Sequence, residues 1–199
     1  MASFSVKDVS ALRARTGAGM MDCKKALEET GGDLEKAVDL LRQKGIARAE
    51  KRSGRGATEG VIGSYIHFNG KYGVLVELNC ETDFVARTGD FQALAKELAQ
   101  HIAFANPLAV STDAVPADVL EREKAIYEKQ VAESGKPEAV RAKIVEGKLK
   151  KFYQERVLLE QPYVKDDAVK VGDLVKSVSG KLGENVVVRR FARFELGGD

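Results

Sequence analysis

Apolar residues recur at helical spacing through the first 45 residues of the chain and predict three short helices. Ser5 and Asp33 stand where the first and third helices need an N-cap, and Gly45 stands where a C-terminal glycine would end the third. Helices of this length are marginal alone, so we expect them to pack together as a small bundle. The apolar stripes are Val6, Val9 and Leu12, then Met20, Cys23 and Leu27, and finally Leu34, Ala37, Val38 and Leu41.

Strict alternation of apolar and other residues begins at Ile62 and predicts a pair of strands. The alternation continues to Phe68, and the pair Asn69-Gly70 that follows is favoured in a type I′ hairpin turn. The return strand runs from residue 71 to residue 80, and its alternate side chains should share one buried face. These side chains are Val74, Val76, Leu78 and Cys80.

Helical patterns return after residue 85 and fill most of the remaining chain. Asp90 is the expected cap of the first of these helices, and two long, charged helices at about 116–155, separated by Gly135 and Pro137, predict a helical hairpin. A helix over 171–182 precedes a strand over 185–196, which we expect to pair with the earlier strands. The fold class is therefore predicted to be α+β with an antiparallel sheet. The buried stripe after Asp90 is Phe91, Leu94, Ala95, Leu98 and Ile102.

Composition narrows the class of protein. The 32 Lys and Arg residues nearly balance the 30 Asp and Glu residues, whereas a dedicated nucleic-acid binder usually carries a clear excess of positive charge. Two cysteines, Cys23 and Cys80, do not make a disulfide framework in 199 residues and suit a reducing compartment. The sequence shows no signal peptide and no apolar run long enough to span a bilayer, so we expect a cytosolic protein without a membrane contact.

The sequence lacks the motifs of phosphate-binding loops, metal sites and catalytic centres. The nearest approach to a phosphate-binding loop begins at Gly63 and has the wrong spacing, and the cysteines and histidines lack the spacing of a zinc site. Cys80 and His67 could form a nucleophile pair across the strand hairpin; alternatively, Cys80 is a small buried hydrophobic residue and His67 is structural. We therefore expect no enzyme activity, no cofactor and no resident metal.

Three long segments stand out when the chain is taken as a whole. They are residues 15–45 (RTGAGMMDCKKALEETGGDLEKAVDLLRQKG), 79–87 (NCETDFVAR) and 135–155 (GKPEAVRAKIVEGKLKKFYQE), with shorter ones at 161–164 (QPYV) and 190–196 (RFARFEL). In this order they resemble signatures of the bacterial elongation factor Ts family, and the resemblance covers essentially the whole chain. It implies a three-helix N-terminal domain of the ubiquitin-associated type, an α/β core with a coiled-coil-like helical hairpin, and an exchange factor for the GTPase elongation factor Tu.

The resemblance also implies which residues act on the GTPase. In the family, the loop with the TDFV motif enters the GTPase near its magnesium site, and here that loop is Thr82, Asp83, Phe84 and Val85. Phe84 would be an apolar wedge, and Asp83 would disturb the groups that support magnesium, so that GDP leaves and GTP can bind. Taken alone, the residues allow another interpretation, in which Phe84 packs in the protein's own core and Asp83 caps the next helix.

A second contact with the GTPase is implied for the N-terminal helices. Arg13, Met20 and Met21 match family positions that touch another helix of the GTPase, and methionine suits such a surface because it is flexible and polarisable. Met20 could instead belong to the core of the bundle. The resemblance thus divides the chain into residues 1–55, a GTPase-binding domain with a basic linker, and residues 56–199, an α/β core and dimerisation domain.

The resemblance further bears on oligomeric state. Many members of the family are longer and carry a second copy of the core region with an added C-terminal module. This chain ends at Asp199 and contains one strand pair of the GVLVELNC type, so one copy would present half of the expected core surface. We therefore expect a symmetric homodimer, in which the second copy supplies the missing half.

The main alternative is a different class of protein, an RNA- or ribosome-binding module. It would use the basic residues Arg48, Lys51, Arg52 and Arg55. Such a run is more often a solvated face or a linker, and the nearly neutral total charge argues against RNA as a partner. Steep salt-dependent binding of RNA, without any effect on a GTPase, would favour this alternative. We expect no direct nucleic-acid contact.

Overall fold

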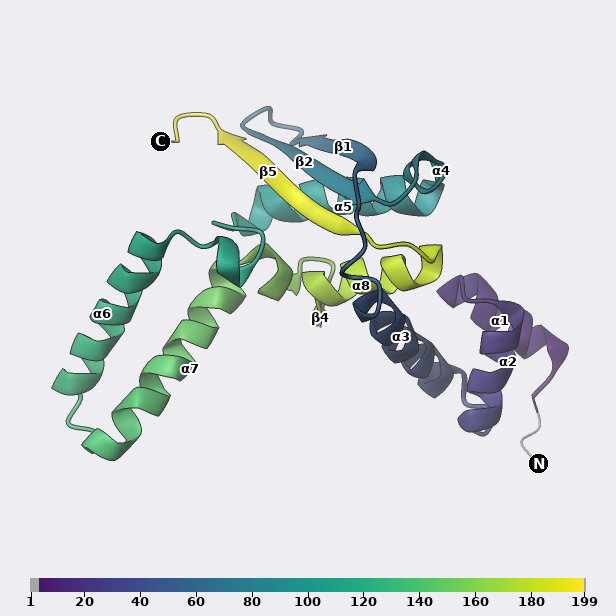
Figure 1. Ribbon diagram of the computed structural model, residues 1–199, viewed down its shortest axis with the longest axis horizontal. Coiled ribbons are helices and arrows are strands. Elements are labelled where there is room, and N and C mark those ends of the chain that lie inside the picture. Colours follow the sequence, from purple (N-terminus) through teal and green to yellow (C-terminus); the bar gives the residue numbers. More distant parts are fainter. Residues whose placement is uncertain (1–3, 199) are drawn as a thin grey trace. The chain divides into compact units, whose positions relative to one another are not determined.

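The three N-terminal helices begin where the sequence predicts (Figure 1). They are α1 (Val6–Thr16), α2 (Met20–Glu29) and α3 (Leu34–Glu50) in the structure, a computed structural model that describes residues 4–198. Ser5 caps α1 in a capping box: the Asp8 N–H donates to Ser5 Oγ, and the Ser5 N–H donates to Asp8 Oδ2. Asp33 caps α3 by accepting from a backbone N–H. Both predicted caps are confirmed.

The N-terminal helices enclose a core of their own, built around Leu12, Cys23 and Leu27. The predicted stripe of α1 was wrong at Val6, which is exposed. Residues spaced by three drift around a helix by about 60° per step, so Val6 points well away from the buried Leu12.

The prediction that Gly45 ends the third helix was also wrong, because α3 continues through it to Glu50. Gly45 lies against α8 (Val171–Leu182), at the position of Gly180. A methyl group on Gly180 would lie 2.5 Å from the Gly45 carbonyl oxygen. The glycine therefore serves a close helix crossing and not a helix end.

A three-stranded sheet forms from β1 (Glu59–Ile66), β2 (Tyr72–Cys80) and β5 (Val187–Glu195), in the order β1-β2-β5. The sheet is antiparallel: the Leu196 N–H donates to Lys71 O at one end of the β2–β5 pair, and Arg190 pairs with Glu77 further along. The pairing of the last strand with the earlier hairpin is thus confirmed, as is the α+β class. The buried face of β2 is the predicted one, namely Val74, Val76, Leu78 and Cys80.

Helix α5 (Gly89–Ala105) lies along the sheet (Figure 1). Its predicted stripe from Phe91 to Ile102 is buried throughout. The strand β1 approaches it closely, because a side chain at Gly63 would meet the backbone of Ala95 at 2.8 Å. Asp90 is not the cap of α5: it lies in the first turn, and Thr88 Oγ1 accepts the Phe91 N–H instead.

The hairpin between β1 and β2 is confirmed, but its turn is not the predicted type I′. That turn needs positive φ at both Asn69 and Gly70, and only Gly70 has it, at 68°. The Gly70 N–H donates to His67 O, and the His67 N–H donates to Tyr72 O, so the loop holds four residues. The Asn69 side chain accepts the Lys71 N–H and stabilises this longer turn.

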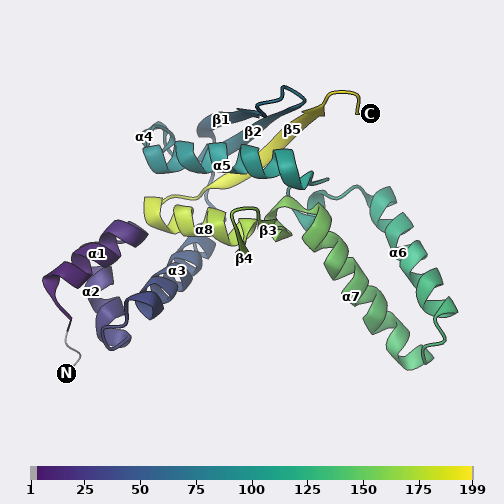
Figure 2. The same cartoon turned by 180° about the vertical axis from the view of Figure 1, so that it is seen from behind.

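The predicted helical hairpin consists of α6 (Ala117–Glu133) and α7 (Glu138–Arg156), which lie side by side (Figure 2). Its base packs on a small core around Phe152 and Val157. Two short strands follow the helical hairpin and pair with each other, and they were not predicted from the sequence: β3 (Pro162–Tyr163) and β4 (Asp166–Lys170). Short 3₁₀ turns lie at Thr112–Ala114 and Leu158–Glu160.

The described residues form two units. The first contains residues 4–60, 79–91 and 174–187, and the second contains residues 61–78, 92–173 and 188–198. The first unit therefore brings together the N-terminal helices, the segment after β2 and most of α8, although these lie far apart in the sequence.

Candidate functional site

The TDFV loop, Thr82–Val85, begins just after β2 and turns at once into the four-residue helix α4 (Asp83–Ala86). Thr82 is the N-cap of this helix, since its side chain accepts a hydrogen bond from the Val85 N–H at 3.4 Å. Ala86 is buried and fixes the inner side of the turn. The loop is therefore an ordered turn with defined inner and outer sides.

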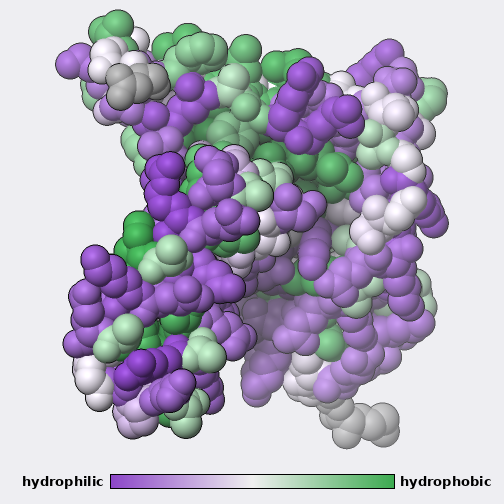
Figure 3. Space-filling model, turned by 60° about the vertical axis from the view of Figure 1, so that its left-hand side comes forward, coloured by the Kyte–Doolittle hydropathy of each residue, from purple (hydrophilic) through white to green (hydrophobic). Residues whose placement is uncertain are grey.

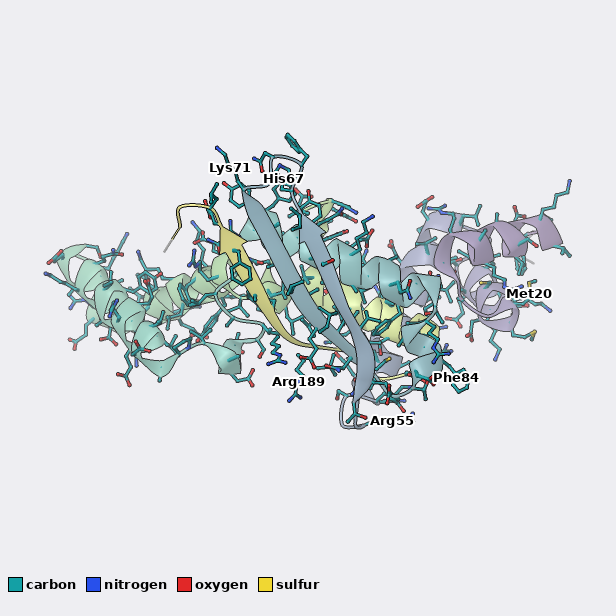
Figure 4. The ribbon with its side chains drawn as sticks, turned by 90° about the horizontal axis from the view of Figure 1, so that it is seen from above. Met20, Arg55, His67, Lys71, Phe84 and Arg189 are labelled. Carbon is teal, nitrogen blue, oxygen red and sulfur yellow. The ribbon has the colours of Figure 1, made fainter. Side chains whose placement is uncertain are left out.

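Phe84 lies on the outer side of this turn. The residue is 78% exposed, and Figure 4 shows its side chain pointing away from the ribbon. Burial of a phenylalanine side chain contributes about 1.5–3 kcal/mol, and here that gain is still available to a partner. The alternative interpretation, in which Phe84 packs in the protein's own core, does not fit this position.

Asp83 is half-buried and paired with Arg87, the residue that follows α4. Its Oδ2 lies 2.8 Å from Nη2 of Arg87, one turn further along. An ion pair this exposed contributes little to stability in water, so Arg87 can be exchanged for a group of a partner. The capping role that Asp83 could have taken belongs to Thr82.

Sequence reasoning missed one carboxylate beneath the loop, that of Glu184. Its Oε2 accepts the N–H groups of Glu81 and Thr82, each at 3.0 Å, and its Oε1 accepts the Thr82 hydroxyl at 2.6 Å. No local pattern reveals this contact, because Glu184 lies 102 residues beyond Thr82 in the chain. The only hint is that Glu184 falls between the two last predicted elements, where the chain must turn.

Cys80 lies under the loop. Of the two roles that the sequence allows, nucleophile or small buried hydrophobic residue, it takes the second. It is fully buried, and its Sγ donates to Thr82 O at 3.1 Å. Burial, helped by the negative charge of Glu184, raises the pKa of the thiol, which therefore stays protonated.

A nucleophile pair of Cys80 with His67 is not formed. His67 hydrogen-bonds Tyr72 at the start of β2, whereas Cys80 ends that strand, roughly 25 Å away at the usual rise per residue. The His67 ring is instead held by the Tyr65 hydroxyl, 2.8 Å from Nδ1.

The three N-terminal residues implied by the resemblance are at the surface. Met20 is 44% exposed and Met21 is 63% exposed, at the start of α2, and Arg13 is exposed on α1. Met20 therefore does not belong to the buried core of the bundle, where its apolar stripe would have placed it. Figure 4 shows Met20 on the N-terminal helices.

The basic run that suggested an RNA-binding module is largely engaged within the protein. Arg48 makes two hydrogen bonds with the Asp22 carboxylate, at 2.9 and 3.0 Å, and Arg55 lies 3.6 Å from Glu81. Arg52 is partly buried, and Lys51 is exposed. These contacts oppose the use of this stretch as a free phosphate-binding surface.

The described part of the chain offers neither a cluster of metal ligands nor a helix that could cross a membrane. Within residues 4–198, His, Cys, Asp and Glu side chains do not gather in threes at a position where they could hold a metal ion. Over the same residues, none of the helices combines the length and the apolar character that a membrane crossing requires.

Comparison with known proteins connects this geometry to a family. The model of the family described as Elongation factor TS matches residues 43–198. Elongation factor Ts of Solidesulfovibrio magneticus is 56% identical over 199 residues, 100% of both chains, and that of Coprothermobacter proteolyticus is 59% identical over 194 residues, 98% of both chains. Elongation factor Ts of Geotalea uraniireducens is 57% identical over 98% of this chain and 90% of its own. The chain belongs to the elongation factor Ts family.

Proposed function

We propose that this chain is a guanine nucleotide exchange factor for elongation factor Tu in translation elongation, and that it works in the cytoplasm. It binds the GDP-bound GTPase, disturbs the magnesium site and promotes release of GDP, so that GTP can bind. The observation that supports this most is the exposed Phe84 ring on a capped turn, in a chain of the elongation factor Ts family.

The TDFV loop acts as a wedge in this proposal. Phe84 leaves water and enters a cleft of the GTPase, and the gain from its burial drives the insertion. Asp83 exchanges its Arg87 partner for groups around the magnesium ion of the GTPase. A divalent cation is the largest local charge in a nucleotide site, so weakening its ligands loosens the hold on the diphosphate of GDP.

The proposal needs no bond to be made or broken by this chain. The factor binds the nucleotide-free GTPase more tightly than the GDP-bound form, and by linkage GDP must bind the complex more weakly by the same ratio. GTP in excess then displaces the factor. The chain is accordingly proposed to be a binding protein and not an enzyme, without a cofactor of its own.

The N-terminal helices supply a second contact. We name Arg13, Met20 and Met21 the N-terminal patch: an exposed cation on α1 and two exposed, flexible apolar side chains at the start of α2, which is a composition that suits a protein partner. In this proposal, residues 1–55 hold the GTPase while residues 56–199 carry the loop and the dimer contact. Binding through the patch keeps the loop near its target.

A homodimer is part of the proposal and rests on the outer face of the sheet, the face turned away from α5. Leu75 lies on it because its neighbours in β2 face α5, and Phe194 lies on it because Arg193 donates to Ala103 O of α5. Figure 3 shows hydrophobic residues gathered among hydrophilic ones in the upper part of that view of the molecule. An open apolar sheet face is typical of a protein interface. The exposed apolar residues of this face are Ile62, Ile66, Leu75 and Phe194.

The direct test is release of a fluorescent GDP from purified elongation factor Tu, followed with and without this protein. We expect wild type to accelerate release strongly, and we expect Phe84→Ala and Asp83→Ala each to lose about tenfold or more of that acceleration, since each removes a group that acts in the wedge.

The matched control is Val164→Ala, which removes an exposed apolar side chain elsewhere on the surface. It should keep the full acceleration. Wild-type protein that leaves GDP release unchanged would overturn the proposed function, and an unimpaired Phe84→Ala variant would overturn the role of the wedge.

A further inference from the structure

The conformation of the TDFV loop is held by a turn that follows α8 and lies far from the loop in the sequence. The Glu184 carboxylate takes up every hydrogen-bond donor at the start of the loop, namely the N–H groups of Glu81 and Thr82 and the Thr82 hydroxyl. Hydrogen bonds to an ionised carboxylate are about twice as strong as those between neutral groups. One side chain therefore fixes the direction in which the loop leaves β2.

The turn that carries Glu184 is itself held in place. The Ser179 hydroxyl donates to Glu184 O, and the Asn185 N–H donates to Glu81 Oε1 at 2.6 Å. Gly183, with φ of 79°, lets the chain reverse after α8. Glu184 and Glu81 thus each accept from the other's segment, so the contact between loop and turn is reciprocal.

The same turn also holds the linker from the N-terminal helices. The Asn185 side-chain amide donates to Arg55 O at 2.7 Å and to Ser53 O at 3.4 Å. Arg55 in turn lies 3.6 Å from the Glu81 carboxylate. Linker, loop and turn therefore share one polar network, which lies within the first of the two units.

We propose that Glu184 is a positioning residue for nucleotide exchange, which holds the TDFV loop in the conformation that presents Phe84 to the GTPase. The proposal rests on the proposed function and deepens it. A loop that is already ordered loses little conformational freedom on insertion, whereas a loose loop must be ordered at the moment of binding. Glu184 does not touch the GTPase in this scheme and acts through Thr82.

The test is Glu184→Gln, which keeps the size of the side chain and removes its charge. An amide has one acceptor oxygen and cannot accept from all three donors. We expect hydrogen exchange at the Glu81 and Thr82 amides of the free protein to speed up about tenfold, as the loop opens locally. We also expect the maximal rate of GDP release to fall about tenfold, with the half-saturating concentration changed less than about twofold.

The matched control is Glu160→Gln, which removes another glutamate charge, paired with Lys170 at 2.8 Å and remote from the loop in sequence. It should change neither the amide exchange of the loop nor the release rate. Unchanged exchange at Glu81 and Thr82 in Glu184→Gln would overturn the proposal, and so would an unchanged maximal rate with an active wild type. If the wild-type protein does not accelerate the release of GDP from elongation factor Tu, the proposed function is wrong. The amide measurement on the free protein still decides whether Glu184 orders the loop.

A double-mutant cycle separates positioning from general loss of stability. Thr82→Val removes the hydroxyl that donates a hydrogen bond to Glu184, and the double variant should lose less exchange activity than the product of the two single losses. Losses that multiply fully, together with a lowered unfolding midpoint in urea, would show a merely structural role and overturn the proposal.

Discussion

Gly180 and Gly45 touch through their backbones, so that α8 and α3 cross without any side chain between them. A methyl group on Gly180 would lie 2.5 Å from the Gly45 carbonyl oxygen and 2.7 Å from its Cα. Backbone atoms cannot rotate away as a side chain can. The crossing therefore holds α3, and with it the N-terminal helices, on α8 within the first unit.

The first prediction follows from this crossing. We expect Gly180→Ala to lower the stability of the protein by about 1–3 kcal/mol, because an overpacked site must push two helices apart. Thermal and urea unfolding, followed by circular dichroism, would measure the change.

Gly147→Ala is the control for this substitution, since Gly147 lies inside α7 with open space around it. It should stabilise the protein by about 0.5–1 kcal/mol, because alanine is the better helix former. Equal effects of the two substitutions would contradict the close crossing.

Much of the fold could be predicted because its signals are local. The caps Ser5 and Asp33 need only their own turn, and the buried face of β2 follows from alternation within a single strand. The stripe of α5 is likewise complete in sequence, from Phe91 to Ile102. The position of the TDFV loop after a strand could also be predicted, since β2 ends at Cys80.

What could not be predicted depends on contacts between distant segments. Gly45 looks like a helix end until Gly180 is placed against it. By composition Asp90 is the better N-cap candidate, and only the geometry of the helix start assigns the role to Thr88. The hydrogen bonds from the loop to Glu184 require the turn after α8 to lie beside the end of β2, and the spacing of apolar residues in the sequence does not indicate this contact.

The second prediction concerns the pH dependence of stability. Hydrogen bonds from Arg48 hold the pKa of Asp22 below its usual range. A group whose pKa is lower in the folded state than in the unfolded state stabilises the protein fully at pH values above its unfolded pKa, which for an aspartate is about 4. That stabilisation is lost as the pH falls through the pKa of the folded state. We expect Asp22→Asn to cost up to about 1 kcal/mol at neutral pH, since the pair is partly exposed.

The measurement is urea unfolding of wild type and Asp22→Asn from about pH 7 down to about pH 3. The two proteins should converge at the acidic end, where wild type is protonated as well. Asp39→Asn, at an exposed position of α3, controls for the loss of one negative charge. A stability difference that grows toward low pH would have the opposite sign and would refute the assignment.

The third prediction concerns the N-terminal patch. Met21→Ala should raise the concentration of factor needed for half-maximal GDP release by about fivefold to tenfold, with an unchanged maximal rate, because the patch binds the GTPase equally before and after release. Its stability should be unaffected, since Met21 is mostly exposed. Gln43→Ala, on the exposed side of α3, is the control. A reduced maximal rate in Met21→Ala would assign the patch to release itself.

The fourth prediction tests the homodimer through the outer face of the sheet. Leu75→Glu places a charge at the middle strand, and a charge left without a partner in an apolar interface is costly. We expect it to weaken dimerisation at least about a hundredfold, as measured by sedimentation equilibrium. Val164→Glu, at a side chain with the same 48% exposure as Leu75, should leave the dimer intact. The monomeric variant should stay folded, because Leu75 is already about half exposed to water. A wild type that sediments as a monomer would contradict the homodimer, and so would a Leu75→Glu variant that remains dimeric.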